Sequence, residues 1–470
     1  MNKEVANYLH QVLRKYSLDI PKEKDELFQA FAAEDAQQKD FDELNNIQKR
    51  MTERWTRKSL IDDIKSKALQ IPNARVGKRY DFTFDVKALG LNGVAAFDLK
   101  AIGITGLEWD SVNKTLSGTP KEPGEHRLTL RFHVEGSDPD ETMEERGIAL
   151  VVNADPKSLW QNLPSNDTDS YWKPDSASAT LTIADRKVVV ASNRGRSHAH
   201  EGKFRDDDFK VASLNGTGWS IVAVADGAGG SKYSRKGSFI ACNAAVQYFQ
   251  EKLSPDEFVE LESVIVANGA SNTEETGKAL SALVMAHMGK AAHHAHTSIA
   301  AEAEKQLAAV KDYSTTLIFA LIKKFDFGYF ISSFWVGDGG IAIYDREGGE
   351  VALLGIPDAG EFAGQTRFIT MPDIFTSPNF YKRIFVRTVP RFTALVLMTD
   401  GITDPKFGTD AALSRIEKWN EFWADLGGTN DDRARVSFDP ANDAIEKELL
   451  YWMDFWSPGN HDDRTLALVY

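Results

Sequence analysis

The sequence predicts an α+β protein built from a helical segment, a small all-β domain and a larger domain in which helices flank a β-sandwich. Three observations predict it. Apolar residues recur at helical spacing over residues 1–70, alternate with polar residues over 71–153, and form short strand-like runs between a few long helical stretches over 179–470. Residues 154–178 are rich in turn-forming residues and are expected to be a linker.

The first 70 residues are expected to form two or three helices. Val5 and Leu9 lie on one helical face, Phe41 and Leu44 lie on another further along, and Pro21 separates the first helix from the second. Such helices either pack on each other or on the next domain, or they form a docking or dimerising element. We favour the first interpretation.

Residues 71–153 are expected to form a compact β-sandwich. Apolar and polar residues alternate over 80–86, 128–134 and 148–152, with turn signals between these stretches. Residues 106–110, 116–120 and 124–130 resemble the immunoglobulin-like (cadherin-like) repeat of many bacterial proteins. The resemblance covers about 71–153 and implies a binding or spacer role without chemistry.

The composition excludes several classes of protein. The net charge of −14 argues against general binding to nucleic acid or to an anionic membrane, which needs a basic surface. Cys242 is the only cysteine, so the chain has neither an internal disulfide nor a cysteine-based zinc site. No signal peptide and no apolar stretch of membrane-spanning length is evident, and a cytoplasmic location is expected.

Acidic residues follow several apolar runs in the second half of the chain. Asp226 ends the run 221–225 and is followed by glycine, and Asp338, Asp400 and Asp462 stand at similar strand ends. A further acidic cluster occupies 206–208. Carboxylates without basic partners are the ligands that Mg²⁺ and Mn²⁺ prefer, and two such ions can activate a water molecule. The pattern predicts one carboxylate-built metal site.

The order of these segments resembles that of the metal-dependent serine/threonine phosphatase family, type 2C (the PPM family), in its bacterial form. The matching segments are 205–209, 225–230, 314–317, 336–340, 398–404 and 461–466. Each segment alone is short, but six in the order of the family, within about 180–470, are specific. The resemblance implies the phosphatase 2C fold, with a β-sandwich flanked by helices.

The resemblance also implies a site for two Mn²⁺ or Mg²⁺ ions and a third, weaker ion. Asp226 would bridge two ions, Gly227 would offer its carbonyl, and Asp400 and Asp462 would complete the coordination of the first ion together with Asp226. Asp207, with Asp206 as the weaker candidate, would hold water molecules or bind the second ion. The implied metal ligands are Asp206, Asp207, Asp226, Gly227, Asp338, Asp400, Asp404 and Asp462, of which Asp338 and Asp404 match the third ion.

Two departures from the family's pattern concern catalysis. Animal members carry a histidine after Asp-Gly as the proposed general acid, whereas Ala228 stands here, so water, His461 or His198 is expected to supply the proton. The arginine that clamps the phosphate is open, and Arg196 and Arg205 are the candidates. The residues expected to act in catalysis are Asp226, Asp400, Arg196 and Arg205.

The function that the resemblance implies is hydrolysis of phosphoserine and phosphothreonine in proteins, by a dinuclear centre and metal-activated water, in signalling. The expected partners are a phosphoprotein substrate and a cognate serine/threonine kinase, with no nucleic acid and no membrane. Two alternatives stay open. One is a pseudophosphatase adaptor that binds a phosphoprotein or kinase without turnover, and the other is a phosphatase of small phosphate esters.

Overall fold

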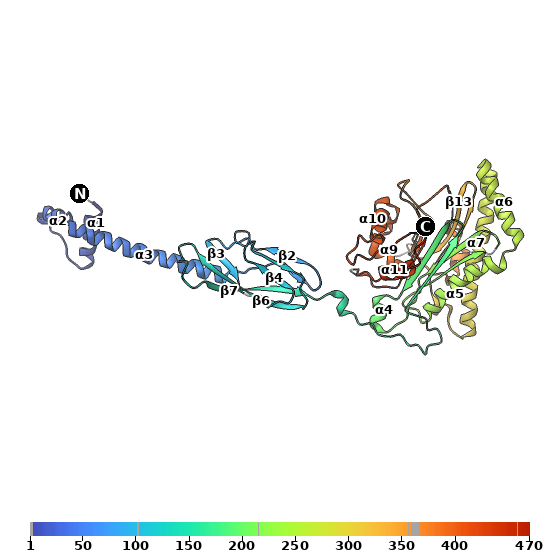
Figure 1. The fold of residues 1–470 in the computed structure, drawn as a ribbon, viewed down its shortest axis with the longest axis horizontal. Helices are drawn as coiled ribbons and strands as arrows, with labels where there is room; N and C mark the ends of the chain where they lie inside the picture. Colours follow the sequence, from blue (N-terminus) through green and yellow to red (C-terminus); the bar gives the residue numbers. More distant parts are fainter. Residues whose placement is uncertain (1–2, 101–102, 215, 356, 359–365, 458) are drawn as a thin grey trace. The chain divides into compact units, whose positions relative to one another are not determined.

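The chain forms two compact units, Met1–Leu159 and Trp160–Tyr470. The computed structural model describes residues 3–100, 103–214, 216–355, 357–358, 366–457 and 459–470, and Figure 1 shows its helices and strands. Among the helices described, none combines the length and the apolar character needed to cross a membrane. The boundary between the units falls inside the predicted linker 154–178, and the first strand of the second unit begins there too, at Ser176.

Three α-helices occupy the beginning of the first unit. Phe28 of the second helix packs with Ala6 of the first, and the ring of Tyr8 lies 5.4 Å from that of Phe41 on the third. At the far end of the third helix, Ile64 joins the core of the β-strand module that follows. The helices are α1 (Lys3–Lys15), α2 (Asp25–Ala32) and α3 (Asp35–Ser66).

The rest of the first unit is a module of two small sheets around one core. One sheet has the order β1-β7-β6-β3 and the other β2-β5-β4. Alternate residues of β6 and β7 are buried, as the predicted period of two requires. The strands are β1 (Ala74–Arg75), β2 (Tyr80–Thr83), β3 (Val94–Leu99), β4 (Leu107–Asp110), β5 (Thr115–Gly118), β6 (Gly124–Val134) and β7 (Glu144–Asn153).

The second unit is built on two antiparallel sheets, of order β10-β11-β12-β13-β16 and β15-β14-β17-β18-β9-β8. Val222 and Val224 of the first sheet share one apolar cluster with Leu395 and Leu397 of the second, so the sheets pack face to face. The strands are β8 (Ser176–Ile183), β9 (Arg186–Asn193), β10 (Asp208–Leu214), β11 (Trp219–Ala225), β12 (Leu317–Phe325), β13 (Gly328–Val336), β14 (Gly340–Asp345), β15 (Glu350–Leu353), β16 (Ile384–Val389), β17 (Ala394–Met398) and β18 (Arg464–Val469).

Helices cover the outer faces of this sandwich (Figure 1). Ile221 and Ala223 point away from the other sheet and pack under α5, α6 and α7, whereas Val396 and Met398 pack under α9, α10 and α11. Because both faces of the central strands are buried, β11 and β17 are continuously apolar rather than alternating. The helices are α4 (Arg196–Glu201), α5 (Ser234–Gln247), α6 (Pro255–Ser271), α7 (Glu274–Lys305), α8 (Asp373–Thr376), α9 (Asp400–Phe407), α10 (Ile416–Leu426) and α11 (Ile445–Trp452).

Several elements of the second unit differ from what its sequence predicts. The apolar spacing over 410–423 predicts a single helix, but a 3₁₀ turn occupies Asp410–Ser414 and α10 starts only at Ile416. No helix is predicted over 255–271, where α6 lies, although Ser254 and Glu257 form a capping box at its start. The strands β8 and β10 are likewise not predicted. The core residues of α6 and α10 pack on different sheets, which the local sequence does not reveal.

The close approach of Gly106, which directly precedes β4, to the turn after β5 provides a test of the first unit. Gly106 has φ +89°, and a Cβ there would lie 2.0 Å from the carbonyl oxygen of Thr119. Gly106→Ala is expected to destabilise the module by about 3 kcal/mol or more, because left-handed strain and overpacking add. Gly77→Ala is the control, since Gly77 has φ +75° with nothing within 4 Å, and it should cost about 1–2 kcal/mol.

Hydrogen exchange of the full chain measures this difference. Amides of β4, β5 and β6 should exchange faster in Gly106→Ala than in Gly77→Ala, while those of β11 and β12 keep the parent rate. Equal protection of β4–β6 in the two variants would contradict the steric explanation.

Candidate metal centre

Three carboxylates meet at one end of the sandwich. Asp226 follows β11, Asp338 follows β13, and Asp400 begins α9 directly after β17 and Thr399. One carboxylate oxygen from each lies within 4.8 Å of the others. This convergence follows from the topology, because the strand ends that carry these residues lie at the same edge of the two packed sheets.

The segment around Asp226 is held by the chain that leads into β12. The backbone N–H of Asp226 donates to Thr316 Oγ1 at 2.8 Å, and its carbonyl accepts from Thr315 Oγ1 at 2.7 Å. A side chain at Gly227 has no room, because a Cβ there would lie 2.6 Å from the carbonyl oxygen of Asp206. The Asp-Gly pair therefore lets two backbone segments approach each other at the cluster.

Asp207 adds a fourth carboxylate in a fixed orientation. It is fully buried, and its Oδ2 accepts hydrogen bonds of 2.8 Å from Thr399 Oγ1 and Thr465 Oγ1. Its Oδ1 has no hydrogen-bond partner among the residues that the structure describes. Burial, and then the charge of Asp463, raise the pKa of Asp207 to about 7.

Buried carboxylates repel one another at this site. Burial is the main cause that raises the pKa of Asp226 well above its ordinary value, and the charges of Asp400 and Asp207 add to it. The pKa of Asp400 is raised in the same way, by burial and then by the charges of Asp338 and Asp462. Asp338 Oδ1 and Asp400 Oδ1 also lack hydrogen-bond partners within the described chain. Convergent oxygens without donors fit a hard divalent cation.

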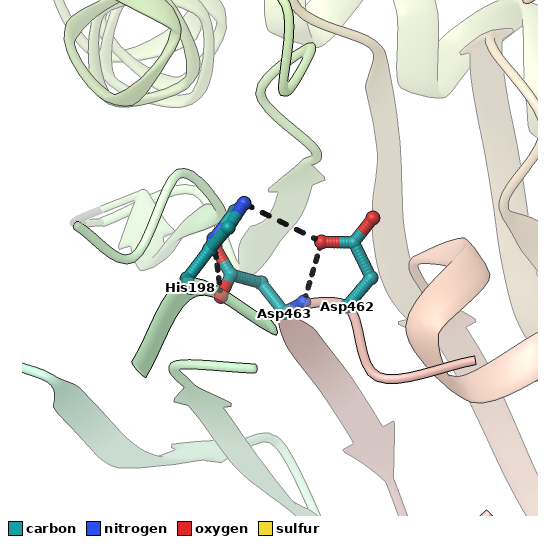
Figure 2. Close-up of side chains that lie close together, drawn as sticks. All are labelled: His198, Asp462 and Asp463. Atoms are coloured by element: carbon teal, nitrogen blue, oxygen red, sulfur yellow. Dashed lines mark hydrogen bonds and ion pairs between the residues drawn. The ribbon is translucent and has the colours of Figure 1, made fainter. Parts of the chain in front are cut away.

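Asp462 lies in a second, adjoining cluster, which Figure 2 shows. His198 Nδ1 lies 3.0 Å from Asp463 Oδ1, and His198 Nε2 lies 3.9 Å from Asp462 Oδ1. Burial disfavours the charged imidazole, but the hydrogen bond and charge of Asp463 outweigh it and raise the pKa of His198 to about 9. The sequence predicts that Asp462 shares an ion with Asp226 and Asp400, whereas the structure groups Asp338 with those two.

Asp463 has a structural part in this second cluster. Its Oδ1 accepts the backbone N–H of Gly195 at 2.6 Å, and its Oδ2 accepts the backbone N–H of Asp206. One buried carboxylate thereby joins the start of β18 to the segments before α4 and before β10. Burial, followed by the charge of Asp463, raises the pKa of the neighbouring Asp206 to about 6, although a hydrogen bond with the side chain of Ser234 acts against this rise.

Asp404 lies one helical turn after Asp400 on α9. Its Oδ2 accepts a hydrogen bond of 3.1 Å from Asn460 Nδ2. Burial, and among the neighbouring charges first that of Asp338, raise the pKa of Asp404 above its ordinary value. The charges of Asp404 and Asp338 therefore repel each other, and a shared third ion stays a prediction.

The two candidate phosphate-clamping arginines have different surroundings. Arg205 is only 2% exposed, and it donates to the carbonyl oxygen of Asp207 at 2.7 Å and to Ser192 Oγ at 2.6 Å. A buried guanidinium engaged in this way holds the backbone of a cluster residue. This replaces the expectation that Arg205 contacts a substrate. Arg196 at the start of α4 is more accessible, and it pairs with Asp454 beside a cavity of about 150 Å³.

Sequence reasoning missed the residues that orient the carboxylates. Thr399 and Thr465 hold Asp207, and Thr315 and Thr316 hold the backbone of Asp226. The only sequence signal is that each threonine lies next to or within a matched segment. Lys173, inside the predicted linker, donates to the carbonyl oxygen of Asp207 at 2.6 Å, and no local pattern points to it.

Replacing Asp400 tests the repulsion. In metal-free protein, Asp400→Asn should raise the melting temperature, because it removes one of several buried like charges. Mn²⁺ should raise the melting temperature of the parent through binding to the folded state, and this rise should be lost in the variant. Asp443→Asn, which changes an exposed carboxylate of the same unit, is the control and should behave as the parent. A parent protein that is indifferent to Mn²⁺ would refute the metal centre.

Replacing Thr465 tests the orientation of Asp207. Thr465→Val keeps the shape of the side chain but removes the donor to Asp207 Oδ2, so the Kd for Mn²⁺ measured by calorimetry should rise about tenfold or more. Thr182→Val at an exposed position of β8 is the matched control. An unchanged Mn²⁺ affinity in Thr465→Val would show that this hydrogen bond has no part in metal binding.

Several known proteins are similar to this chain. A sequence model of the family described as Protein phosphatase 2C matches residues 194–449. The chain is 30% identical over 190 residues to serine/threonine-protein phosphatase 3 of Escherichia coli (strain K12), which covers 40% of this chain and 64% of that protein. The chain thus spans less than two thirds of the length of that relative.

Solved structures of phosphatases are also similar to this chain. Serine-threonine phosphatase 2C from Toxoplasma gondii is 16% identical, with 63% of this chain and 99% of that chain covered and a TM-score of 0.39. The catalytic domain of serine threonine protein phosphatase PstP, solved in complex with two manganese ions, is 14% identical, with 60% and 97% covered and a TM-score of 0.32.

The family match extends over more than half of the 470 residues and includes Asp226, Asp338 and Asp400. The chain belongs to the protein phosphatase 2C family of serine/threonine phosphatases, which are metal-dependent hydrolases that use Mn²⁺ or Mg²⁺.

Proposed function

We propose that this chain is a protein serine/threonine phosphatase that hydrolyses phosphoesters at a centre of two Mn²⁺ or Mg²⁺ ions. The observation that carries the proposal is the cluster of Asp226, Asp338 and Asp400, with Asp207 beside it. One buried carboxylate oxygen each of Asp207, Asp338 and Asp400 has no hydrogen-bond partner within the described chain. When bound, such ions neutralise phosphate charge and lower the pKa of water, so that water attacks phosphorus at neutral pH.

The chain's own residues would hold and orient the reacting groups. Asp226, Asp338 and Asp400 would bind the ions, and Asp207 would present its Oδ1 because Thr399 and Thr465 occupy its Oδ2. Among the remaining expected ligands, Gly227 would offer its carbonyl, and Asp206, Asp404 and Asp462 would act from the rim of the cluster, Asp404 toward a third ion.

His198 is better suited than His461 to meet the leaving group. A Cβ at Gly229 would lie 4.0 Å from His198 Nε2, so this nitrogen faces the loop that follows Asp226. The ring of His461 instead lies 4.6 Å from the rings of both Trp160 and Trp456. His198 would donate a hydrogen bond to the leaving-group oxygen from the side where Ala228 offers no polar group.

Arg196 is the remaining candidate for orienting the phosphate. Its ion pair with the exposed carboxylate of Asp454 can exchange for a phosphate, because a pair at the surface contributes little energy. The guanidinium matches the geometry of a phosphate with two parallel donors.

The proposal extends to the rest of the chain. Residues 71–153, with two sheets around one core, would be an immunoglobulin-like module with a binding or spacer role. The proposed partners are a phosphoprotein substrate and a cognate serine/threonine kinase. We propose a cytoplasmic location, which is consistent with a lone, buried cysteine.

Turnover of phosphopeptides with Mn²⁺ tests the function. The parent should release phosphate from phosphoserine and phosphothreonine peptides only with a divalent cation. Asp226→Asn and Asp400→Asn should lower kcat by about a hundredfold or more, because each removes charge that organises the site. Asp443→Asn should retain the parent kcat. Mn²⁺ binding without turnover would favour the adaptor, and turnover of p-nitrophenyl phosphate but not of phosphopeptides would favour a small-ester phosphatase.

A further inference from the structure

The middle of α3 is a helix without a partner inside its own unit. Residues 42–56 are all exposed, and none of them belongs to an apolar cluster of the first unit among the residues that the structure describes. An isolated helical segment of this length is marginal in water, and in proteins most helical stability comes from packing of an apolar face. Only the two ends of α3 are anchored, by Phe41 against α1 and by Ile64 in the β module.

Four large apolar residues form a stripe along this exposed stretch. We call Leu44, Ile47, Met51 and Trp55 the α3 stripe. Their spacings of three, four and four residues bring them to one face of an α-helix. Leu44 and Ile47 are each 38% exposed, Met51 is 64% exposed and Trp55 is 71% exposed. A contiguous apolar row with an exposed tryptophan is typical of an interaction surface rather than of a solvated helix.

Charged side chains around the α3 stripe are distributed by sign along the helix. Asp40 and Glu43 lie toward its beginning, and Arg54 and Lys58 lie toward its end. By helical periodicity Glu43 and Arg54 flank the same side of the stripe, while the other side carries uncharged polar residues. Within the described chain no ion pair or hydrogen bond engages these four charged side chains.

We propose that the α3 stripe binds the α3 stripe of a second copy of this chain in an antiparallel helix pair. A two-fold axis at the level of Lys49 brings Leu44 opposite Trp55 and Ile47 opposite Met51 of the second copy. The same axis brings Asp40 opposite Lys58 and Glu43 opposite Arg54. In a parallel pair, each charged residue would lie beside the same residue of the second copy, and like charges would repel. Charge complementarity therefore selects the antiparallel arrangement.

The antiparallel pair gives the protein two catalytic units in one particle. The pair needs no residue of the metal centre, so it stands independently of the proposed activity. The N-terminal helices pack on one another at the start of α3 and on the β module at its end, as the favoured interpretation expects, and the proposal gives the exposed middle of α3 the dimerising role that the sequence leaves open.

Sedimentation velocity of the full chain over a range of concentrations tests the proposal. The parent is expected to sediment as a dimer that dissociates on dilution. Met51→Glu and Trp55→Glu should each raise the dimer Kd by about a hundredfold, because every substitution occurs twice in a two-fold interface. Thr56→Glu adds the same charge at an exposed position on the opposite face and should leave the Kd unchanged.

Charge exchange tests the orientation. Glu43→Arg and Arg54→Glu should each weaken the dimer, because each places like charges opposite one another twice. The double variant Glu43→Arg/Arg54→Glu should restore the parent Kd in an antiparallel pair, whereas a parallel pair gains nothing from the exchange. A monomer at every concentration, a dimer that tolerates Trp55→Glu, or a failure of the double exchange would overturn the proposal. A cross-link between a reactive side chain introduced at Trp55 and residues 160–470 of the same chain would also overturn it, because the α3 stripe would then contact the second unit of its own chain.

Discussion

The electrostatic repulsion among buried carboxylates is the constraint on which the second unit depends. Asp226, Asp338 and Asp400 lie within reach of one common atom, and Asp207 adds its unpaired oxygen nearby. Removing such charges from water without partners is costly, so the scaffold has to resist their separation. The face-to-face sheets supply this resistance, because the strands that end in these residues have both faces buried in apolar clusters. A divalent cation would turn the repulsion into attraction.

A layer of neutral and basic donors determines how each carboxylate is presented. Two threonines occupy one oxygen of Asp207, and Arg205 and Lys173 hold its backbone carbonyl. In the second cluster, Asp463 has the corresponding role, because it accepts hydrogen bonds from the backbone of Gly195 and Asp206 at the start of β18. These contacts leave free the oxygens that point to the centre. They explain why a buried arginine next to an acidic cluster stabilises the site instead of binding substrate.

The first unit follows a different physical logic. Its β module has a closed core of alternating residues, and α1 and α2 bury a small cluster of their own. Between these two parts, α3 has an exposed row of apolar residues. Acidic residues lie toward the beginning of this row and basic residues toward its end, without ion pairs within the described chain. Exposure of this apolar row to water costs free energy in the monomer. A two-fold contact with a second copy would bury the row and pair the charges. Catalytic and associating surfaces would then lie on separate units of one chain.

The sequence by itself determined the strands whose character is local. The apolar runs 219–225, 384–389 and 394–398 of the sequence predict strands, and β11, β16 and β17 have these limits. β-Branched and apolar residues between turn-forming ones leave few alternatives there. It also identified Asp226, Asp338 and Asp400 as candidate ligands, since an acid at the end of a buried strand has a limited set of uses. The start of α6 could also be predicted from the sequence, because its capping box is formed by residues that are close together in the chain.

Only the tertiary structure decided which carboxylates share a cluster. Distances between residues far apart in sequence depend on how the two sheets pack, so Asp338 joins Asp226 and Asp400 while Asp462 turns to His198. Arg205 is a second example. Its place in the sequence beside the acidic cluster suits an arginine that binds substrate, and only the structure shows that its side chain is buried. Local sequence carries periodicity and turn chemistry, whereas the neighbours of a side chain across the fold are a property of packing alone.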